Sequence, residues 1–413
     1  MTITTTRRGF LGTVSAGMAL SASRSTSAAT SVEDGNYWDL IRAQFAFDEA
    51  RVPMNAANLC PSPRSVAERV YQLTYDIDRD CSFQNRGKLT DLLEHSRSGV
   101  AAALNVSADE VALVRNTSEA NNVVNNGLDL GPGDEIVLWD QNHPTNNVAW
   151  DVRAARAGFK VRRVSVPARP VDEGQLIEPF LDALTDSTRV LALTHVSNVS
   201  GIRLPIAEIA ARARRRGVHV HVDGAQTWGA FDIDLVALGC DTYTASAHKW
   251  FMGPKEAGLL YVRSDRIEAL WPSIVAPGWG EDADTDLVGA RKFESLGQRD
   301  DACLAAITDA SALHASIGAA RVEQRVRELS QRLKSGVADM GLSLVTPMDP
   351  ALSGGVCIVE VAADRQSDVW NRLYSEHGIA GAPTGGLRLC PHVYNTTVHV
   401  DRALAGIRAL MVG

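Results

Sequence analysis

VHVHVDGAQTWGAFDIDLVALGCDTYTASAHKW, residues 218–250, is the stretch that decides the fold. Residues 218–222 and 242–245 are short runs with few charged residues, and they predict strands that are buried on both faces. Asp223 directly follows the first run, and Lys249 lies just beyond the second. Ligands of open α/β sheets bind at the carboxyl ends of strands, so we expect these two side chains to converge on one crevice.

Strands and helices alternate on both sides of this stretch. Further strands are predicted at residues 110–115, 134–139, 160–166, 189–195 and 258–262, and helices at 118–127, 144–157, 178–184 and 207–216. This alternation predicts an α/β doubly wound sheet. Near residue 295 the pattern changes to long helices over 302–341, then strands at 355–361 and 386–389 and helices at 364–376 and 398–411. We therefore expect a smaller C-terminal α+β domain.

The pairing of Asp223 with Lys249 suits pyridoxal phosphate (PLP). The amine of Lys249 would form the Schiff base with the cofactor. The carboxylate of Asp223 would keep the pyridine nitrogen protonated, so that the ring accepts electrons from a carbanion. Ser246 and His248 flank the lysine and are candidates for binding the phosphate. The alternative is that Asp223 caps a turn and Lys249 is solvated.

Over roughly residues 50–410, the sequence resembles the fold-type I, class V aminotransferase family of PLP enzymes. That family includes cysteine desulfurases and isopenicillin N epimerase-like enzymes. The resemblance implies a large domain with a mostly parallel seven-stranded sheet and a smaller C-terminal α+β domain. We assign residues 30–60 to an N-terminal segment packing on the small domain, 61–295 to the large PLP-binding domain and 296–413 to the small domain.

Several other segments match the family pattern. Thr117 and Ser118 follow a predicted strand and open a helix, where backbone N–H groups form an anion site. In the family this segment holds the cofactor phosphate, although the pair could also be a plain helix cap. His143 matches the residue that stacks on the pyridine ring, or it is structural. Asn198 and Gln226 match residues near the phenolate oxygen of the cofactor.

Two C-terminal segments extend the resemblance. Residues 293–300, FESLGQRD, resemble a loop that reaches the phosphate of the neighbouring subunit, which implies a homodimer. Gln298 stands there in place of the usual threonine, and the following Arg-Asp pair leans toward the epimerase-like branch. Arg388 matches the family arginine that clamps an α-carboxylate, a task suited to a planar guanidinium fork. Its alternative role is a surface ion pair.

The sequence indicates the cofactor more clearly than it indicates the reaction. Desulfurases carry a nucleophilic cysteine shortly before the matching arginine, but residues 378–387 contain none, and Cys390 lies in a predicted strand where it would pack. We expect chemistry through an external aldimine and a Cα carbanion, with Lys249 as general base. Transamination, epimerisation, decarboxylation, β-elimination and oxidation all remain open. The alternatives are a cysteine desulfurase or lyase, or a non-catalytic periplasmic binding protein, which would not need Asp223, Lys249 and Arg388 together.

The N-terminus predicts export. Arg7 and Arg8 precede Gly-Phe-Leu, a weakly apolar run follows, and small residues lead up to Ala29. This order is typical of a twin-arginine signal peptide over residues 1–29. The run is too short and polar to span a membrane. We therefore expect a periplasmic or extracytoplasmic enzyme. The sequence resembles most in kind the twin-arginine-exported periplasmic members of the family that tailor siderophore peptides, and this resemblance implies the tailoring of a secreted specialised metabolite.

The amino-acid composition limits the classes of partner that the chain is expected to bind. The 413 residues carry 41 Lys and Arg against 49 Asp and Glu, a net charge of −8. An acidic chain of this kind lacks the basic footprint of a nucleic-acid binder. The six cysteines form no C-x-x-C pair, so neither a metal site nor a dense disulfide framework is expected. No segment after the N-terminus reaches 18 consecutive apolar residues, so the mature chain is expected to have no membrane span. The expected partner is a small-molecule or peptide substrate with a free amino acid group.

Overall fold

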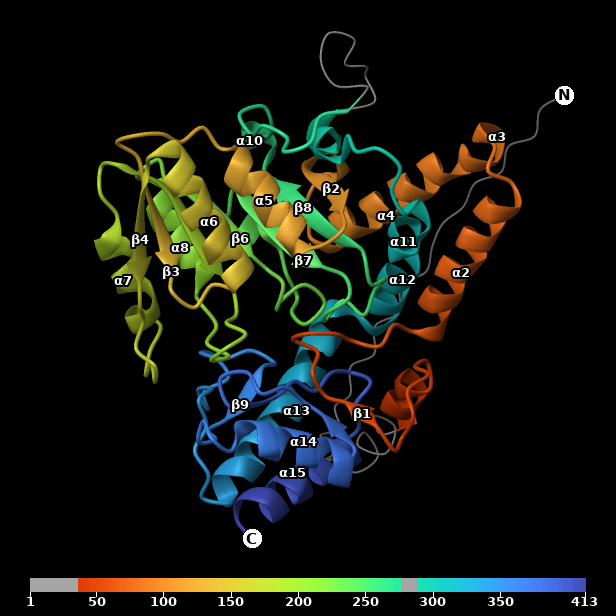
Figure 1. The fold of residues 1–413 in the computed structure, drawn as a ribbon, viewed down its shortest axis with the longest axis vertical. Helices are drawn as coiled ribbons and strands as arrows, with labels where there is room; N and C mark the ends of the chain where they lie inside the picture. The colour runs from red at the N-terminus through yellow and green to blue at the C-terminus, as the bar shows by residue number, and fades with distance from the viewer. Residues whose placement is uncertain (1–35, 277–287) are drawn as a thin grey trace, which may run out of the picture.

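A seven-stranded sheet forms the centre of the larger part of the molecule, drawn in the upper half of Figure 1. The computed structural model describes residues 36–276 and 288–413, so the predicted export signal lies outside the described residues. The strand order is β2-β8-β7-β6-β5-β3-β4. The bounds are β2 Val111–Val114, β3 Glu135–Trp139, β4 Lys160–Val164, β5 Thr188–Thr194, β6 His219–Asp223, β7 Thr242–Ser246 and β8 Gly258–Val262. β8 runs antiparallel to β2 and β7, while the pairs from β7 to β4 are parallel, which confirms the mostly parallel sheet.

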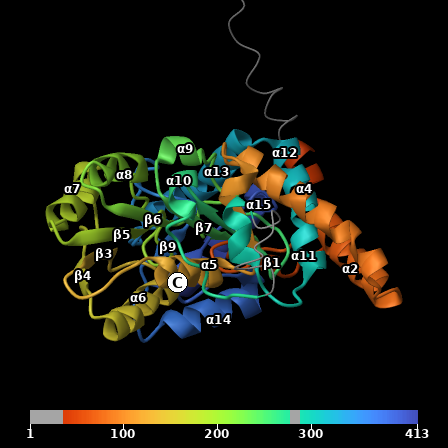
Figure 2. The same ribbon diagram turned by 90° about the horizontal axis from the view of Figure 1, so that it is seen from above.

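Helices cover both faces of this sheet (Figure 2). One face carries α5 (Thr117–Gly127) and α6 (Pro144–Ala157). The other carries α7 (Gly174–Ala183), α8 (Ile206–Arg214) and the short α9 (Leu235–Leu238). The alternation of side chains along β3 explains how both faces are buried. Ile136 packs in the same cluster as Trp150 of α6, whereas Trp139 points the other way and its ring meets Phe180 of α7.

The edge strand β4 departs from the buried pattern of its neighbours. Lys160 and Arg163 are exposed along it, and Arg162 pairs with Glu135 of β3. Charged side chains on an edge strand discourage pairing with another chain. The central strands β5, β6, β7 and β8 are almost wholly buried, as the sequence predicted.

Helices from two distant parts of the chain form a layer beside β2. They are α2 (Arg64–Arg79), α3 (Phe83–Arg86), α4 (Lys88–Ala103), α11 (Asp301–Ala305) and α12 (Ile307–Ile317). Both α11 and α12 pack on α2 and α4 (Figure 1). Residues 301–317 therefore lie with the helices of residues 64–103, although we assigned them to the small domain by sequence. Short turns η1 (Ala108–Glu110), α10 (Ser264–Ile267) and η3 (Gly289–Glu294) complete this side.

The C-terminal part has its own hydrophobic core. It contains α13 (Ala319–Asp339), β9 (Cys357–Val359), α14 (Gln366–His377), β10 (Ile379–Ala380), β11 (Leu387–Leu389) and α15 (Thr397–Met411). β11 pairs antiparallel with β9. The N-terminal strand β1 (Val52–Pro53) pairs parallel with β10, and Val52 and Met54 join this core. Residues 52–54 thus pack on the small domain.

No single helix among the described residues meets the requirements of a membrane span. None of them alone combines enough length with enough apolar character. Asp301–Ile317 and Ala319–Asp339 meet the requirements only as a pair, across a bend of 78°.

Candidate active site

A cavity of about 260 Å³ opens where β5, β6 and β7 end. Thr194, Asp223 and Ser246 are the last residues of these three strands, and all three line the cavity. This is the edge at which open α/β sheets bind ligands. Nine of the residues singled out in the sequence line it together: Thr117, Ser118, His143, Asn198, Asp223, Gln226, Ser246, His248 and Lys249.

Asp223 is held in place from two sides. Its side chain is buried, Oδ2 accepts a hydrogen bond from Asn121 Nδ2 (3.0 Å) and Oδ1 accepts one from the backbone N–H of Ala225 (3.0 Å). A Cβ on the intervening Gly224 would lie 1.9 Å from Cζ of Tyr243, so this position requires glycine. The carboxylate is therefore fixed at the strand end with its charge directed at the cavity.

Lys249 enters the cavity from the turn after β7. Burial lowers the pKa of its amine, and the nearby Arg388 guanidinium lowers that pKa further, against the opposing effect of the Asp223 carboxylate. A lowered pKa leaves more of the amine neutral, which is the nucleophilic form. The turn itself is anchored, since the carbonyl oxygen of His248 accepts a hydrogen bond from Cys60 N (2.8 Å).

Hydroxyl groups gather at the N-terminus of α5. The Oγ atoms of Thr117 and Ser246 lie 2.6 Å apart, and the backbone N–H of Thr117 also donates to Ser246 Oγ (2.8 Å). Asn116 caps the helix by accepting from the N–H of Glu119, and it also lines the cavity beside Ser118. The N-terminus of an 11-residue helix together with these hydroxyls suits the binding of a phosphate.

Unsatisfied polar atoms in the cavity wall indicate a polar ligand. Thr194 Oγ1, Asn198 Oδ1 and His248 Nδ1 are buried and have no hydrogen-bond partner within the described residues. Buried polar groups are normally paired, so atoms of this kind around a cavity mark places for ligand atoms. Burial next to Lys249 also lowers the pKa of His248 to about 4, which keeps its ring neutral near neutral pH.

These groups fit PLP. Lys249 would bind it covalently, Asp223 would pair with its ring nitrogen, and the hydroxyls at the N-terminus of α5 would hold its phosphate. The bound cofactor supplies an electron sink for the charge that is left on a substrate carbon when a proton departs.

His143 and Gln226 line the walls beside Lys249. His143 is the N-cap of α6, and its Nδ1 lies 2.8 Å from Thr145 Oγ1. Burial and Lys249 lower the pKa of His143, so the ring is neutral and apt for stacking. The amide of Gln226 donates to the carbonyl oxygen of Ala57 (3.0 Å) and accepts from Trp250 Nε1 (2.7 Å), which fixes its orientation.

Arg388 approaches the site from β11 of the small domain. Its side chain is buried, Nη1 donates to the carbonyl oxygen of Asn198 (3.0 Å), and Nη2 donates to Asn55 Oδ1 (3.2 Å). Its Nε has no partner within the described residues. The described contacts of Arg388 therefore contain no surface ion pair of the kind considered from the sequence. Its guanidinium lies next to the cavity and has an N–H group, on Nε, that is free to bind a ligand.

Gln298 lies away from this cavity. It is exposed, and its Oε1 accepts a hydrogen bond from Arg86 (3.0 Å). In a single chain, the loop that carries Gln298 does not reach the site that its own chain forms. From the sequence we expected its contact in the neighbouring subunit, which the structure does not contain.

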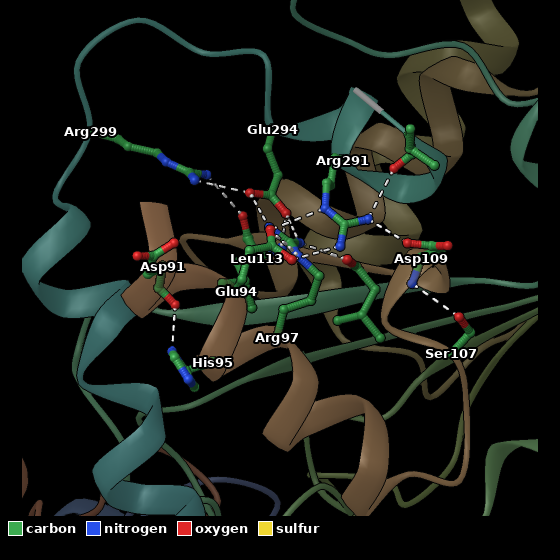
Figure 3. A network of polar contacts seen from close by, with 12 residues as sticks. Asp91, Glu94, His95, Arg97, Ser107, Asp109, Leu113, Arg291, Glu294 and Arg299 are labelled. Atoms are coloured by element: carbon green, nitrogen blue, oxygen red, sulfur yellow. Dashed lines mark hydrogen bonds and ion pairs between the residues drawn. The ribbon is translucent and has the colours of Figure 1, made fainter. Parts of the chain in front are cut away.

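A buried ionic network holds the start of that loop (Figure 3). Glu294 pairs with Arg97 of α4 and with Arg299 (2.9 Å), and it accepts a hydrogen bond from the backbone N–H of Leu113 in β2 (2.7 Å). Arg291 extends the network to Glu94 and Asp109. The Arg-Asp pair that we associated with one branch of the family thus has a structural contact in this chain, through Arg299.

Comparisons with known proteins agree with this site. The family model for aminotransferase class V matches residues 63–409, so the chain belongs to the class V aminotransferase family. It is similar to isopenicillin N epimerase of Streptomyces clavuligerus, with 30% identity over 90% of this chain and 98% of the relative. It is also similar to cysteine desulfurase of Enterobacter sp. (strain 638), with 40% identity over 44% of this chain and 45% of that one.

Solved structures share the fold. The apo structure of a cysteine desulfurase from Thermococcus onnurineus NA1 superposes with a TM-score of 0.81 and 22% identity, covering 91% of this chain and 98% of the other. A structure of C-DES with glycine linked to its PLP cofactor has a TM-score of 0.80 and 25% identity, covering 88% and 98%. The protein is thus a PLP-dependent enzyme of fold type I, and the alternative of a non-catalytic binding protein is wrong.

Some residues of the cavity wall were not predicted from the sequence. Thr194 ends β5, one residue before the end of the strand predicted at 189–195, so the strand-end rule points to its neighbourhood but not to Thr194 itself. Thr145 follows His143 in the first turn of α6. Asn58 reaches the cavity from the N-terminal segment, and no local pattern marks it because its place depends on distant pairing.

Proposed function

We propose that this enzyme moves a proton at the Cα of an amino acid, or of the amino-acid moiety of a peptide, in an epimerase- or aminotransferase-like reaction. The observation that carries the proposal is that Lys249, a buried amine of lowered pKa, lines the same cavity as Asp223 and lies within the electrostatic reach of Arg388. The full-length similarity to isopenicillin N epimerases supports it.

Each residue has a definable task in such a reaction. Arg388 binds the substrate carboxylate with its guanidinium, which orients the bond between Cα and hydrogen. Lys249 accepts the proton from Cα as a general base and can return it to either face or deliver it elsewhere. His143 covers one side of the site and excludes water from it. Asp223 stabilises positive charge at the end of the cavity opposite the substrate.

Cysteine desulfuration is the rival reaction, and the cysteines argue against it. None of the six lines the cavity. Cys390, two residues beyond Arg388, is fully buried in the wall of the small domain, and its backbone N–H donates to Met54. Cys60 is buried as well, which raises its pKa to about 12 and keeps the thiol protonated. A thiolate nucleophile is thus missing where desulfuration needs one.

We further propose a homodimeric, exported enzyme that tailors a secreted specialised metabolite such as a siderophore peptide. The dimer is supported by Gln298, which lies outside the cavity of its own chain on a firmly held loop. Export is supported by the Arg7-Arg8 pattern. A metabolite with a peptide portion supplies the amino acid group that the site requires.

The reaction is tested by hydrogen exchange. Loaded enzyme is incubated in D₂O with L- and D-amino acids, short peptides and a 2-oxo acid, and products are followed by mass spectrometry and chiral chromatography. Epimerisation gives the opposite configuration with one deuterium at Cα, whereas transamination gives an oxo product. Sulfide release from cysteine without exchange into other substrates would refute the proposal. The Lys249→Ala variant is the control for uncatalysed exchange.

A further inference from the structure

A row of polar side chains lies buried between the sheet and α5, behind the cavity. His219, His221 and Asp223 alternate along β6 and so share one face. Thr242 and Thr244 of β7 lie on the same side: Thr242 contacts His221, and Thr244 contacts Asn121 of the helix. Polar groups in such a place require mutual hydrogen bonds, since an unpaired buried polar group is costly.

The amide of Asn121 has one allowed orientation. Its Oδ1 lies 2.6 Å from the hydroxyl of Thr244 and 3.2 Å from Nε2 of His221, and both of these groups can donate to it. Its Nδ2 faces the carboxylate of Asp223 at 3.0 Å. A flipped amide would place oxygen against the carboxylate, so Nδ2 must be the donor to Asp223.

His221, Thr242 and His219 determine in which direction the hydrogen bonds of the row are donated. Complete burial lowers the pKa of His221 to about 3, so its ring is neutral and carries one N–H. That proton lies on Nε2, because Nε2 donates to Asn121; Nδ1 then accepts from the Thr242 hydroxyl at 2.9 Å. The oxygen of Thr242 in turn accepts from Nε2 of His219 at 3.2 Å. Every donor therefore points toward Asp223.

We propose that Asn121, His221 and Thr242 are positioning residues that direct a hydrogen bond at the Asp223 carboxylate and hold it in one rotamer. Aligned hydrogen bonds polarise one another, and a buried charge gains most from such donation. A carboxylate held in this way pairs with a protonated ring nitrogen of PLP without taking the proton from it. The row would thus set the protonation state of the cofactor ring.

A purely structural role for the same residues makes a different prediction. In that case their loss would lower stability but leave the bound cofactor unchanged. The two roles are separated by the chemical shift of the ring nitrogen in ¹⁵N-labelled PLP, which reports its protonation directly. The measurement uses holoenzyme without substrate, so it rests on the cofactor and not on the reaction proposed above.

The test compares three variants with a matched control. Asn121→Leu removes the donor to Asp223, His221→Phe removes the next link, and Thr242→Val is an isosteric change at the far end. Asn125→Leu is the control, because Asn125 is buried one turn further along the same helix and its Nδ2 has no partner within the described residues. All are checked for folding by circular dichroism.

We expect the nitrogen signal to move toward the unprotonated form in the order Asn121→Leu, His221→Phe, Thr242→Val, with Asn125→Leu at the wild-type position. PLP affinity should fall about tenfold to a hundredfold for Asn121→Leu, as for one lost hydrogen bond to a charged group. If Asn121→Leu does not fold, Thr242→Val still separates the positioning role from the structural one. Wild-type nitrogen signals in the folded variants, or an equal change in Asn125→Leu, would overturn the proposal.

Discussion

The hydroxyl oxygens of Thr117 and Ser246 lie 2.6 Å apart, and this contact joins the first turn of α5 to the last residue of β7. Ser246 is three residues before Lys249, so the anion site at the helix and the reactive amine are held at a fixed separation. The covalent and the phosphate attachment of one cofactor can therefore be satisfied together.

Borohydride reduction of the loaded enzyme should place the pyridoxyl group on Lys249. Lys249 lines the cavity, and its lowered pKa favours the neutral, nucleophilic form of the amine. Lys255 already donates to the carbonyl oxygen of Cys60 and to Ser62. Proteolysis and mass spectrometry locate the label, and a label on Lys255 or Lys292 would refute the assignment. Lys249→Ala should lose turnover and still bind PLP through the phosphate contacts.

The Asp223→Asn variant should fold and lose about three orders of magnitude in turnover or more, or about 4 kcal/mol, since each ~1.4 kcal/mol is a factor of ten. An uncharged partner leaves the ring nitrogen unprotonated and weakens the electron sink. Steady-state kinetics at saturating PLP measure the loss, and the melting temperature serves as the control for folding. Near-normal turnover in a fully loaded variant would show that the carboxylate has another role.

Glu294→Gln should destabilise the protein by about 1–3 kcal/mol, because it removes the buried carboxylate that Arg97 and Arg299 share. The loss is limited because Arg97 keeps its pair with Glu94 and Arg299 keeps its pair with Asp301. Urea unfolding measures the change. Glu178→Gln is the matched control: it breaks the exposed pair with Arg212, and we expect no measurable loss. Equal effects of the two changes would contradict the importance of the network.

Light scattering of the purified holoenzyme should give twice the mass of one chain. The loop carrying Gln298 would then reach the phosphate in the second subunit, and Gln298→Ala should weaken PLP binding without altering the fold of the subunit. An active monomer with wild-type affinity for PLP would rule out a shared site.

Replacing Arg7 and Arg8 with lysine should keep the protein in the cytoplasm, uncleaved but loaded with PLP. The twin-arginine route carries folded proteins, and PLP is made in the cytoplasm. Cell fractionation with N-terminal sequencing measures the outcome, and the wild-type product should begin near Thr30. Normal export and cleavage of the double variant would exclude this route and remove the support for a periplasmic role.

Much of the sheet was predictable because its strands are short, buried and bounded by helices. All seven were expected, within one or two residues at either end. The antiparallel direction of β8 was not, since direction depends on the connection from β7 and not on side-chain pattern. The packing of α12 on α2 and α4 was not predictable either, because it joins segments about 200 residues apart in sequence.

The residues of the site also fall into those that the sequence predicts and those that it does not. Residues at strand ends and helix starts, such as Asp223 and Thr117, follow from local pattern and the strand-end rule. Asn121 and His221 are different, because each reads as an ordinary buried position until β6 is placed beneath α5. The alternation in HVHVD does place a histidine on the same face as Asp223, and that signal was available in the sequence.

The pairing of β1 with β10 has a consequence for biosynthesis. Residues 52–53 leave the ribosome long before their partners at 379–380 are made. At about 5–20 residues per second, the N-terminal segment waits roughly a quarter of a minute to a minute for that partner. Until then Arg388, which follows β10 in the chain, is missing as well, so the small-domain side of the site is not yet formed. A nascent chain therefore cannot present a complete site before Arg388 has left the ribosome.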